Sequence, residues 1–196
     1  MKSFYLKSLT LACLTFILSS CTQLQQLQNF AKCEFRLNSV ENVRLAGVNI
    51  QEISSINQIG IGDVAKLSAA YLGNELPLGL KLNIDARNPN PTSAALSALD
   101  WIFLIDDIEM TRGNTNQRIQ LPASQTTTIP LLLNFDLKKV LSGKSQNALI
   151  NFALNLAGSG DKPTRLALKA KPTIQIGSAN IPYPNYLNIK TDFTSK

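Results

Sequence analysis

The carboxylates of Asp106, Asp107 and Glu109 are the side chains whose spacing could support chemistry, and they form the chain's acidic cluster. Two carboxylates can act as acid and base in hydrolysis, and three can hold calcium. The cluster falls on a predicted hairpin turn, where acidic side chains are normally solvated. The chain contains no histidine, so a Ser-His or Cys-His pair cannot be built, and a zinc site would rest on carboxylates alone. We therefore expect no catalytic residues, no metal site and no cofactor.

The N-terminus carries the signals of lipid attachment. Lys2 and Lys7 precede an apolar run, SLTLACLTFILSS. This run is too short to span a bilayer well and is typical of a secretory signal. The run leads into Leu18-Ser19-Ser20-Cys21, which resembles a bacterial lipobox. This resemblance implies cleavage before Cys21 and lipidation of its sulfur and its new amino group. The alternative is an ordinary secretory signal with an accidental cysteine.

The residues after Cys21 bear on location. The segment TQLQQLQNF has neither an aspartate next to the cysteine, which would resemble an inner-membrane retention signal, nor an acidic run, which would resemble a surface-export signal. We therefore expect an outer-membrane lipoprotein that faces the periplasm. Residues 1–20 would be the signal peptide and residues 21–33 a lipidated tether, with the membrane as partner through the acyl chains on Cys21.

The net charge argues against nucleic acid as a partner. Without Lys2 and Lys7, the 19 basic residues fall to 17 against 13 acidic ones, which leaves a net charge of +4. The basic residues are scattered, whereas nucleic-acid binding needs a dense patch with interleaved aromatic side chains. Cys33 would have no partner in its own chain once Cys21 is lipidated, so we expect it half-buried or buried near the first strand. An intermolecular disulfide is the alternative.

Most of the secondary-structure elements that the sequence predicts are short strands. Alternating or continuous apolar residues predict strands at residues 34–53 (two strands), 76–87, 96–106, 107–113, 117–124, 125–137, 164–176 and 185–193. About eight strands with regular turn signals predict a single, mainly β domain over residues 34–193. We expect an antiparallel β-sandwich of the immunoglobulin/fibronectin III-like kind, with two or three short helices.

Three segments predict the helices. DVAKLSAAYL predicts a helix over residues 63–72 with Asp63 as N-cap and with Val64, Leu67 and Tyr71 on one face. DLKKVLSG predicts a second, short helix. SQNALINFALNLAG predicts the third, with Gly158 where a C-terminal glycine belongs.

The stretch RNPNPTS follows the strand at residues 76–87. Each proline lacks a backbone donor and keeps the asparagine before it out of the α region. We interpret Asn88-Pro89-Asn90-Pro91 as a turn that ends the strand without leaving a free edge. A binding role for Asn88 or Asn90 is the alternative.

The order of motifs from residue 80 to residue 135 resembles the type 2 late-embryogenesis-abundant family, also called the water-stress and hypersensitive-response domain. The motifs are Asn88-Pro89-Asn90-Pro91, an apolar strand with Trp101, a hairpin into MTRG with Gly113, a strand with Pro122 and the segment TIPLLL. In that family the Asn-Pro pair follows the strand and a glycine closes the returning strand. The hairpin turn often carries glycine, where this chain has Asp106-Asp107. We expect Trp101 in the core.

We expect a non-enzymatic lipoprotein of the cell envelope. The resemblance implies involvement in desiccation or stress tolerance, by stabilising membranes or proteins. The alternative is a lipid-anchored binding module or adaptor for a hydrophobic ligand or an envelope protein. It is motivated by ALINFALNLAG, whose apolar residues spread over more than one helical face. One face can cover the sandwich, and the other needs a neighbour, a ligand or a membrane unless helices 63–72 and 136–142 cover it.

Overall fold

The computed structural model describes residues 28–51, 53, 59–140, 144–156, 158, 160–176 and 178–194. The strands are β1 (Glu34–Leu45), β2 (Val48–Asn49), β3 (Pro77–Arg87), β4 (Ala94–Ile105), β5 (Ile108–Thr115), β6 (Ile119–Leu121), β7 (Thr126–Asp136), β8 (Thr164–Ile176), β9 (Ala179–Pro182) and β10 (Leu187–Phe193). The helices are α2 (Ile61–Leu72), α3 (Leu137–Val140) and α4 (Lys144–Leu156). Strands dominate the described chain, as predicted.

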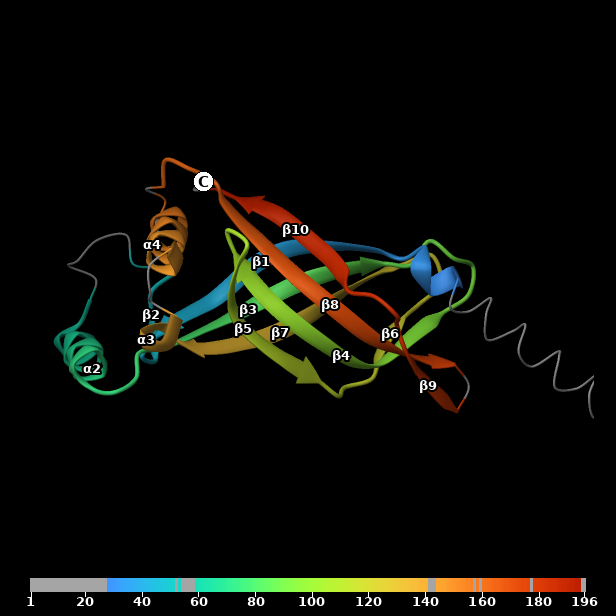
Figure 1. Cartoon of the computed structure of the whole chain (residues 1–196), viewed down its shortest axis with the longest axis horizontal. Coiled ribbons are helices and arrows are strands. Elements are labelled where there is room, and N and C mark those ends of the chain that lie inside the picture. The colour runs from blue at the N-terminus through green and yellow to red at the C-terminus, as the bar shows by residue number, and fades with distance from the viewer. Residues whose placement is uncertain are drawn as a thin grey trace, which may run out of the picture.

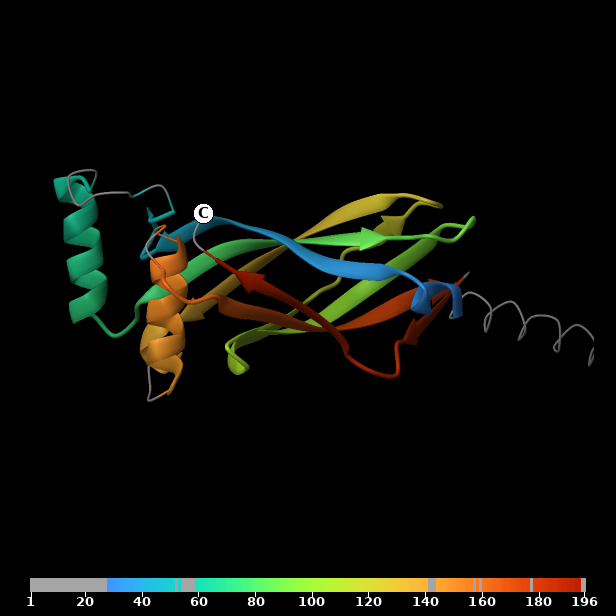
Figure 2. The same cartoon turned by 90° about the horizontal axis from the view of Figure 1, so that it is seen from above.

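The strands form two antiparallel sheets. One has the order β2-β1-β3-β7, and the other has the order β10-β8-β4-β5, with β6 added to β4 and β9 added to β8. Figures 1 and 2 show both sheets running along the long axis, with α2 and α4 at one end and the start of the described chain at the other. This arrangement confirms the predicted antiparallel β-sandwich.

The core lies between the two sheets because alternate residues of each strand point inward. In β3 these residues include Leu82 and Ile84, and in β4 they include Trp101, Phe103 and Ile105. The period-two pattern of β3 and the longer apolar run of β4 therefore predicted both strands correctly. Trp101 lies in the core, as expected.

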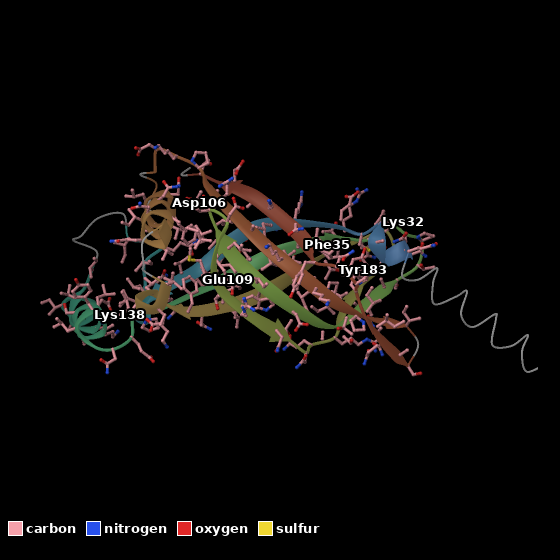
Figure 3. All side chains as sticks on the ribbon, in the orientation of Figure 1. Lys32, Phe35, Asp106, Glu109, Lys138 and Tyr183 are labelled. Atoms are coloured by element: carbon pink, nitrogen blue, oxygen red, sulfur yellow. The ribbon has the colours of Figure 1, made fainter. Side chains whose placement is uncertain are left out.

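The packed domain begins before β1. Residues 28–31 form a helical turn, and Phe30 is only 1% exposed. Its ring centroid lies 5.8 Å from that of Phe35 and 5.7 Å from that of Tyr183, and Figure 3 labels these two residues with Lys32 at this end of the molecule. Residues 28–33 of the predicted tether thus belong to the fold, whereas residues 21–27 lie outside the described residues.

Helix α2 differs from its prediction in two ways. Its N-cap is Gly60, without a side-chain bond, and Asp63 lies inside the helix, where it pairs with Lys66 at 3.1 Å. None of its residues is buried, so the expected apolar face of Val64 and Tyr71 does not enter the core. The reason is position, since α2 lies at the extreme end of the molecule in Figures 1 and 2.

The other two helices follow their predictions more closely. Helix α3 is a single turn after β7, and α4 spans 13 residues. Gly158 has a φ of +75° beyond the end of α4, which confirms its predicted place as a C-terminal glycine. Helix α4 packs its Ala148, Leu149 and Phe152 into the core.

Candidate functional site

Asn88 and Asn90 form a buried polar cluster at the end of β3. The Asn88 side chain is 0% exposed and donates through Nδ2 to the carbonyls of Thr92 (2.9 Å), Leu121 (2.9 Å) and Pro122 (3.2 Å). Its Oδ1 accepts from the backbone N–H of Asn90 at 3.1 Å and from the Asn90 amide at 2.8 Å. The hydrogen-bonding capacity of the Asn88 amide is thus used within the protein, which leaves no exposed group for a ligand.

Asn90 joins this cluster to the start of the chain. Its Nδ2 donates to the carbonyl of Asn29 at 2.7 Å. Cys33 lies beside the cluster, with its Sγ 3.7 Å from Asn88 Oδ1, and its half-buried position agrees with the prediction. Burial raises the pKa of the Cys33 thiol to about 11. Asn88-Pro89-Asn90-Pro91 therefore fastens three segments together.

The edge-protection part of the RNPNPTS interpretation is wrong. Strand β3 lies inside its sheet, with β1 on one side and β7 on the other. The backbone N–H of Asn88 donates to the carbonyl of Gln125, the residue before β7, at 2.8 Å. The hydrogen bonding between β3 and β7 therefore continues into the turn. Neither Asn88 nor Asn90 has a positive φ.

Trp101 and Gly113 are directly opposite each other in the register of β4 and β5. A Cβ on Gly113 would lie 2.4 Å from Cζ2 of the Trp101 indole, which is closer than atoms can approach. The glycine is therefore needed because the indole occupies the space above it. This contact gives a physical reason for two residues of the sequence motif.

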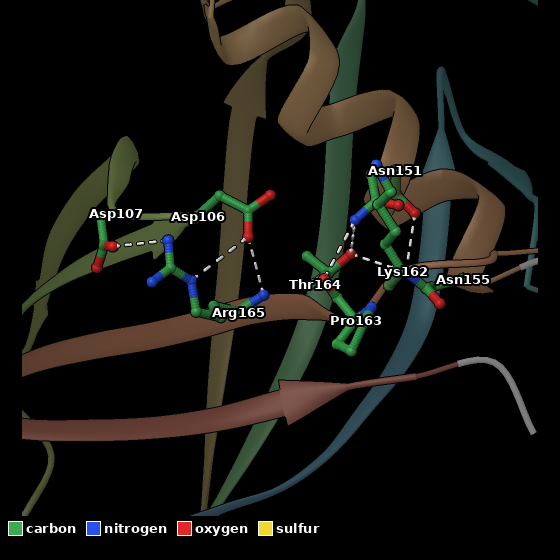
Figure 4. Close-up of polar contacts among 8 residues, drawn as sticks. All are labelled: Asp106, Asp107, Asn151, Asn155, Lys162, Pro163, Thr164 and Arg165. Atoms are coloured by element: carbon green, nitrogen blue, oxygen red, sulfur yellow. Dashed lines mark hydrogen bonds and ion pairs between the residues drawn. The ribbon is translucent and has the colours of Figure 1, made fainter.

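The acidic cluster lies on the predicted turn. Asp106 and Asp107 both have positive φ, 49° and 64°, as a two-residue hairpin turn of type I′ requires. Arg165 lies opposite them, and its Nη2 is 3.0 Å from Asp107 Oδ2 while its backbone N–H donates to Asp106 Oδ1 at 3.0 Å (Figure 4). Glu109 pairs instead with Arg112 at 2.7 Å.

These pairings fit a structural role for the acidic cluster. No group of three His, Cys, Asp or Glu side chains converges as a metal site would require within the described residues. Each carboxylate of the cluster has an arginine partner, and the pKa of Glu109 lies below its ordinary value because Arg112 donates to it. The turn interpretation of these residues is confirmed.

A second polar cluster fastens α4 to β8. Asn155 is buried, and its Nδ2 donates to the carbonyl of Lys162 at 2.7 Å and to the hydroxyl of Thr164 at 2.9 Å. Asn151, one turn earlier, donates to the same hydroxyl at 3.0 Å, as Figure 4 shows. The last turns of α4 are therefore held against the start of β8.

A cleft opens beside this junction, between the edges of the two sheets. Strand β10 is an edge strand of its sheet, and β1 forms the edge of the other sheet except where the short β2 pairs with Arg44 and Leu45. The cleft lies between residues 37–40 of β1 and residues 191–194 at the end of β10. Its volume is about 510 Å³. Leu82 of β3 and Leu166 of β8 belong to the core and line its interior, and the end of α4 closes one side.

The lining of the cleft is mixed. The apolar lining residues are Leu37, Val40, Leu82, Leu156, Leu166 and Phe193. The polar ones are Asn38, Ser39, Gln51, Asn155, Thr191, Asp192 and Thr194. Gln51 is held in place, because its Nε2 donates to the Val40 carbonyl at 3.0 Å. Asp192 is the one ionisable side chain among these lining residues, so the cleft suits an apolar group with a polar end.

The outer face of the β1-β3-β7 sheet carries a buried carboxylate. Asp85 accepts from the Thr128 hydroxyl at 2.9 Å, from Arg36 at 2.9 Å and from the Asn38 amide at 3.1 Å. These donors hold the pKa of Asp85 below its ordinary value, with the Thr128 bond as the largest cause and Arg36 next. Asn38 also lines the cleft, so this network fixes one wall of it.

A comparison with protein-family models shows which family the chain belongs to. The model of the late embryogenesis abundant protein family, of type 2, matches residues 83–185, which is more than half of the sequence. The chain belongs to this family. The match includes the Asn88-Pro91 turn, Trp101 and Gly113, so the late embryogenesis abundant (LEA) domain contains the contacts described above. No curated protein matches the sequence closely enough to count as a relative.

Solved structures resemble this LEA chain only distantly. A crystal structure of a protein from Archaeoglobus fulgidus is 14% identical, with a TM-score of 0.39, and the match covers 82% of this chain and 98% of that one. The solution structure of a protein assigned to the LEA group is 12% identical, with a TM-score of 0.37 and coverage of 94% and 86%. The solution structure of an Arabidopsis thaliana protein is 12% identical, with a TM-score of 0.35 and coverage of 82% and 77%.

The predicted lipidation site lies outside the described residues. Leu18, Ser19, Ser20 and Cys21 fall in this part, so lipid attachment stays a prediction. In the part of the chain that is described, no helix has the length and apolar composition needed to cross a bilayer. The cleft is the feature that sequence reasoning missed, because its walls come from strands about 150 residues apart.

Proposed function

We propose that this LEA protein is a lipid-anchored binding module of the cell envelope, without catalytic activity, that takes an apolar ligand in the cleft between β1 and β10. The cleft carries the proposal. Its volume of about 510 Å³ falls in the range of small-molecule sites, and its lining combines apolar side chains with polar ones. A ligand with an acyl or similar tail would place that tail against Leu156 and Phe193, which line the cleft and are partly exposed.

The other face of α4 supports a binding role. Helices α2 and α3 were expected to cover it, and this expectation is wrong for Ile150 and Leu154, which remain 50% and 43% exposed. These residues lie on the helix that closes the cleft. Exposed apolar surface of this kind is typical of an interaction site.

The anchor is proposed from the sequence. The lipobox-like Leu18-Ser19-Ser20-Cys21 would give a mature chain with acyl chains on Cys21, placed in the outer membrane and facing the periplasm. Mass spectrometry of the mature N-terminal peptide checks this directly. A peptide that begins at Cys21 and carries acyl chains supports the anchor, and an unmodified Cys21 contradicts it.

Native mass spectrometry tests ligand binding. The protein produced from the full chain and purified from its own host's envelope should carry an additional mass that extraction with organic solvent removes. Thr191→Trp places an indole on the inward face of β10 and should abolish this mass. Lys190→Trp is the matched control, because neighbouring residues of a strand point to opposite faces, and it should keep the mass. An equal mass on both variants, or none on the wild type, contradicts a site in the cleft.

Protection under water stress is a second candidate function, and membership of the LEA family favours it. In this reading the anchored domain would stabilise the membrane or neighbouring envelope proteins during drying. A deletion strain should then survive drying and osmotic shock less well than the parent. Restoring the wild-type chain should restore survival, whereas a chain with Cys21→Ala should not. Equal survival of parent and deletion strain contradicts this function.

A further inference from the structure

Helix α2 presents an exposed apolar stripe, which the described chain contacts at Tyr71, where Lys138 Nζ lies 6.0 Å from the ring centroid. Its half-buried residues, Asp63, Leu67 and Ala70, follow helical spacing and mark the side toward the protein. The opposite side carries Ile61 and Leu72, which are 92% and 82% exposed. Val64 and Tyr71 flank this outer side and are also exposed. The outer stripe therefore consists of Ile61, Val64, Ala65, Ser68, Tyr71 and Leu72 and contains no charged residue.

The helix is held in this position from its C-terminal end. Lys138 donates through Nζ to the carbonyl of Tyr71 at 2.6 Å and also to the carbonyl of Gly73. Figure 3 places Lys138 beside α2, at the end of the molecule away from Lys32. A cation at the C-terminal carbonyls stabilises a helix. The stripe is thus displayed by a fixed helix.

The N-terminal segment cannot reach this stripe. The described chain begins at the end of the molecule away from α2 (Figures 1 and 2). Seven residues from Cys21 to Gln28 extend by about 25 Å at most, whereas a strand of the length of β8 spans about 40 Å. The segment that carries the lipid therefore does not cover α2.

A second copy of the chain also fits poorly. Helix α2 has 12 residues and is about 18 Å long. Two such helices in contact would bury far less than the roughly 800 Å² per partner of a stable interface. Binding to a bilayer surface does not require an interface of this area. An uncharged apolar stripe with a tyrosine near its end suits the boundary between head groups and acyl chains.

We infer that α2 is a bilayer-contacting element at the end of the molecule away from the start of the described chain. The charges around it balance, with Lys66, Lys138 and Lys139 against Asp63, Glu75 and Asp136. Contact would therefore rest on apolar insertion and show little dependence on salt. Two membrane contacts, and an N-terminal segment too short to cover α2, both rest on the proposed cleavage and anchor at Cys21, whereas the exposed stripe on α2 does not.

Vesicle sedimentation tests this inference. The chain from Thr22 onward contains the entire described core, which lies between Phe30 and Phe193, and lacks the lipid. With vesicles of phosphatidylcholine and phosphatidylglycerol it should co-sediment to a similar extent at low and high salt. Ile61→Ser with Leu72→Ser should lower the partition coefficient by about tenfold. Leu132→Ser with Tyr186→Ser, also at exposed apolar positions, is the matched control and should leave it unchanged.

Three results would overturn the inference. The first is that the wild type does not co-sediment with vesicles, and the second is that the α2 variant co-sediments equally well. The third is that the wild type is a dimer in sedimentation velocity, whereas the α2 variant is a monomer with unchanged vesicle binding. The cleft is unaltered in the α2 variant. Native mass spectrometry of this variant therefore reports the proposed ligand independently, so failure of one proposal is distinguishable from failure of the other.

Discussion

At the scale of single residues, side chains in a turn connect distant parts of the described structure. Asn88 is an amide in a turn, yet its partners lie at the carbonyls of Leu121 and Pro122, 33 and 34 residues away. Turn chemistry predicted where the strand ends, but it could not show these partners, because no local spacing brings them together. Asn90, bonded to Asn29 across 61 residues, is a second example.

Removing the Asn88 amide should destabilise the fold strongly. Asn88→Ala leaves three carbonyls and the Asn90 amide without their partner, and we expect a loss of about 3 kcal/mol in the free energy of unfolding. Urea denaturation measures it. Asn114→Ala, at an exposed position of β5, should change the same quantity by less than about 0.5 kcal/mol. A similar loss in both variants would contradict the structural role of Asn88.

The contact between Gly113 and Trp101 predicts a second stability effect. Gly113→Ala should lower the free energy of unfolding by about 2 kcal/mol, since the new methyl group overlaps the indole. Trp101→Phe in the same chain should recover part of this loss, because the smaller ring vacates the space. Gly62→Ala in α2, where nothing lies within 4 Å, is the control and should not destabilise. Additive losses in the double variant would contradict a direct clash.

Asp85 predicts a pH dependence of stability. Its pKa in the folded state is lowered, first by Thr128 and then by Arg36, so its contribution is fully present above the ordinary value. The contribution is lost as the pH falls below about 4 and through the lowered folded value. Urea denaturation at pH 7 and pH 3 should therefore show a smaller acid-induced loss for Asp85→Asn than for the wild type. Thr128→Val should give an intermediate loss, and an unchanged dependence in Asp85→Asn would contradict the assignment.

At the scale of elements, strands were predictable and helix environments were not. The alternation in β3 predicts which residues face the core, whereas the continuous apolar run in β4 predicts only that a strand forms. Helical spacing also found α2 and α4, but it cannot tell which neighbour, if any, covers a face. The exposure of α2 and of Ile150 follows from their position at one end of the sandwich, which depends on the whole topology.

Helix α4 should therefore respond differently to the same substitution on its two faces. Leu149→Ala removes a core side chain and should cost about 3 kcal/mol of unfolding free energy. Leu154→Ala, on the half-exposed face, should cost about 1 kcal/mol or less. Thermal denaturation of both variants checks the difference. Equal losses would mean that the outer face of α4 is covered in solution.

At the scale of the whole molecule, the candidate site results from how two sheets meet. Strands β1 and β10 come from opposite ends of the sequence, and the cleft exists only where their edges separate. The family motifs at Asn88-Pro91, Trp101 and Gly113 lie elsewhere and serve the fold. Sequence reasoning could identify the family and the sandwich, but the cleft needs the relative placement of strands that no local pattern contains.

The register of β1 and β3 also determines how the molecule would carry mechanical tension. Glu34 pairs with Arg87 at one end and Leu45 pairs with Leu78 at the other, so the chain enters the two strands from opposite ends. Tension between Lys32 and α2 therefore shears the strands and loads their hydrogen bonds together. Tension between Lys32 and Arg87 instead opens the pairs one at a time. Single-molecule pulling should show a higher rupture force for the first geometry than for the second.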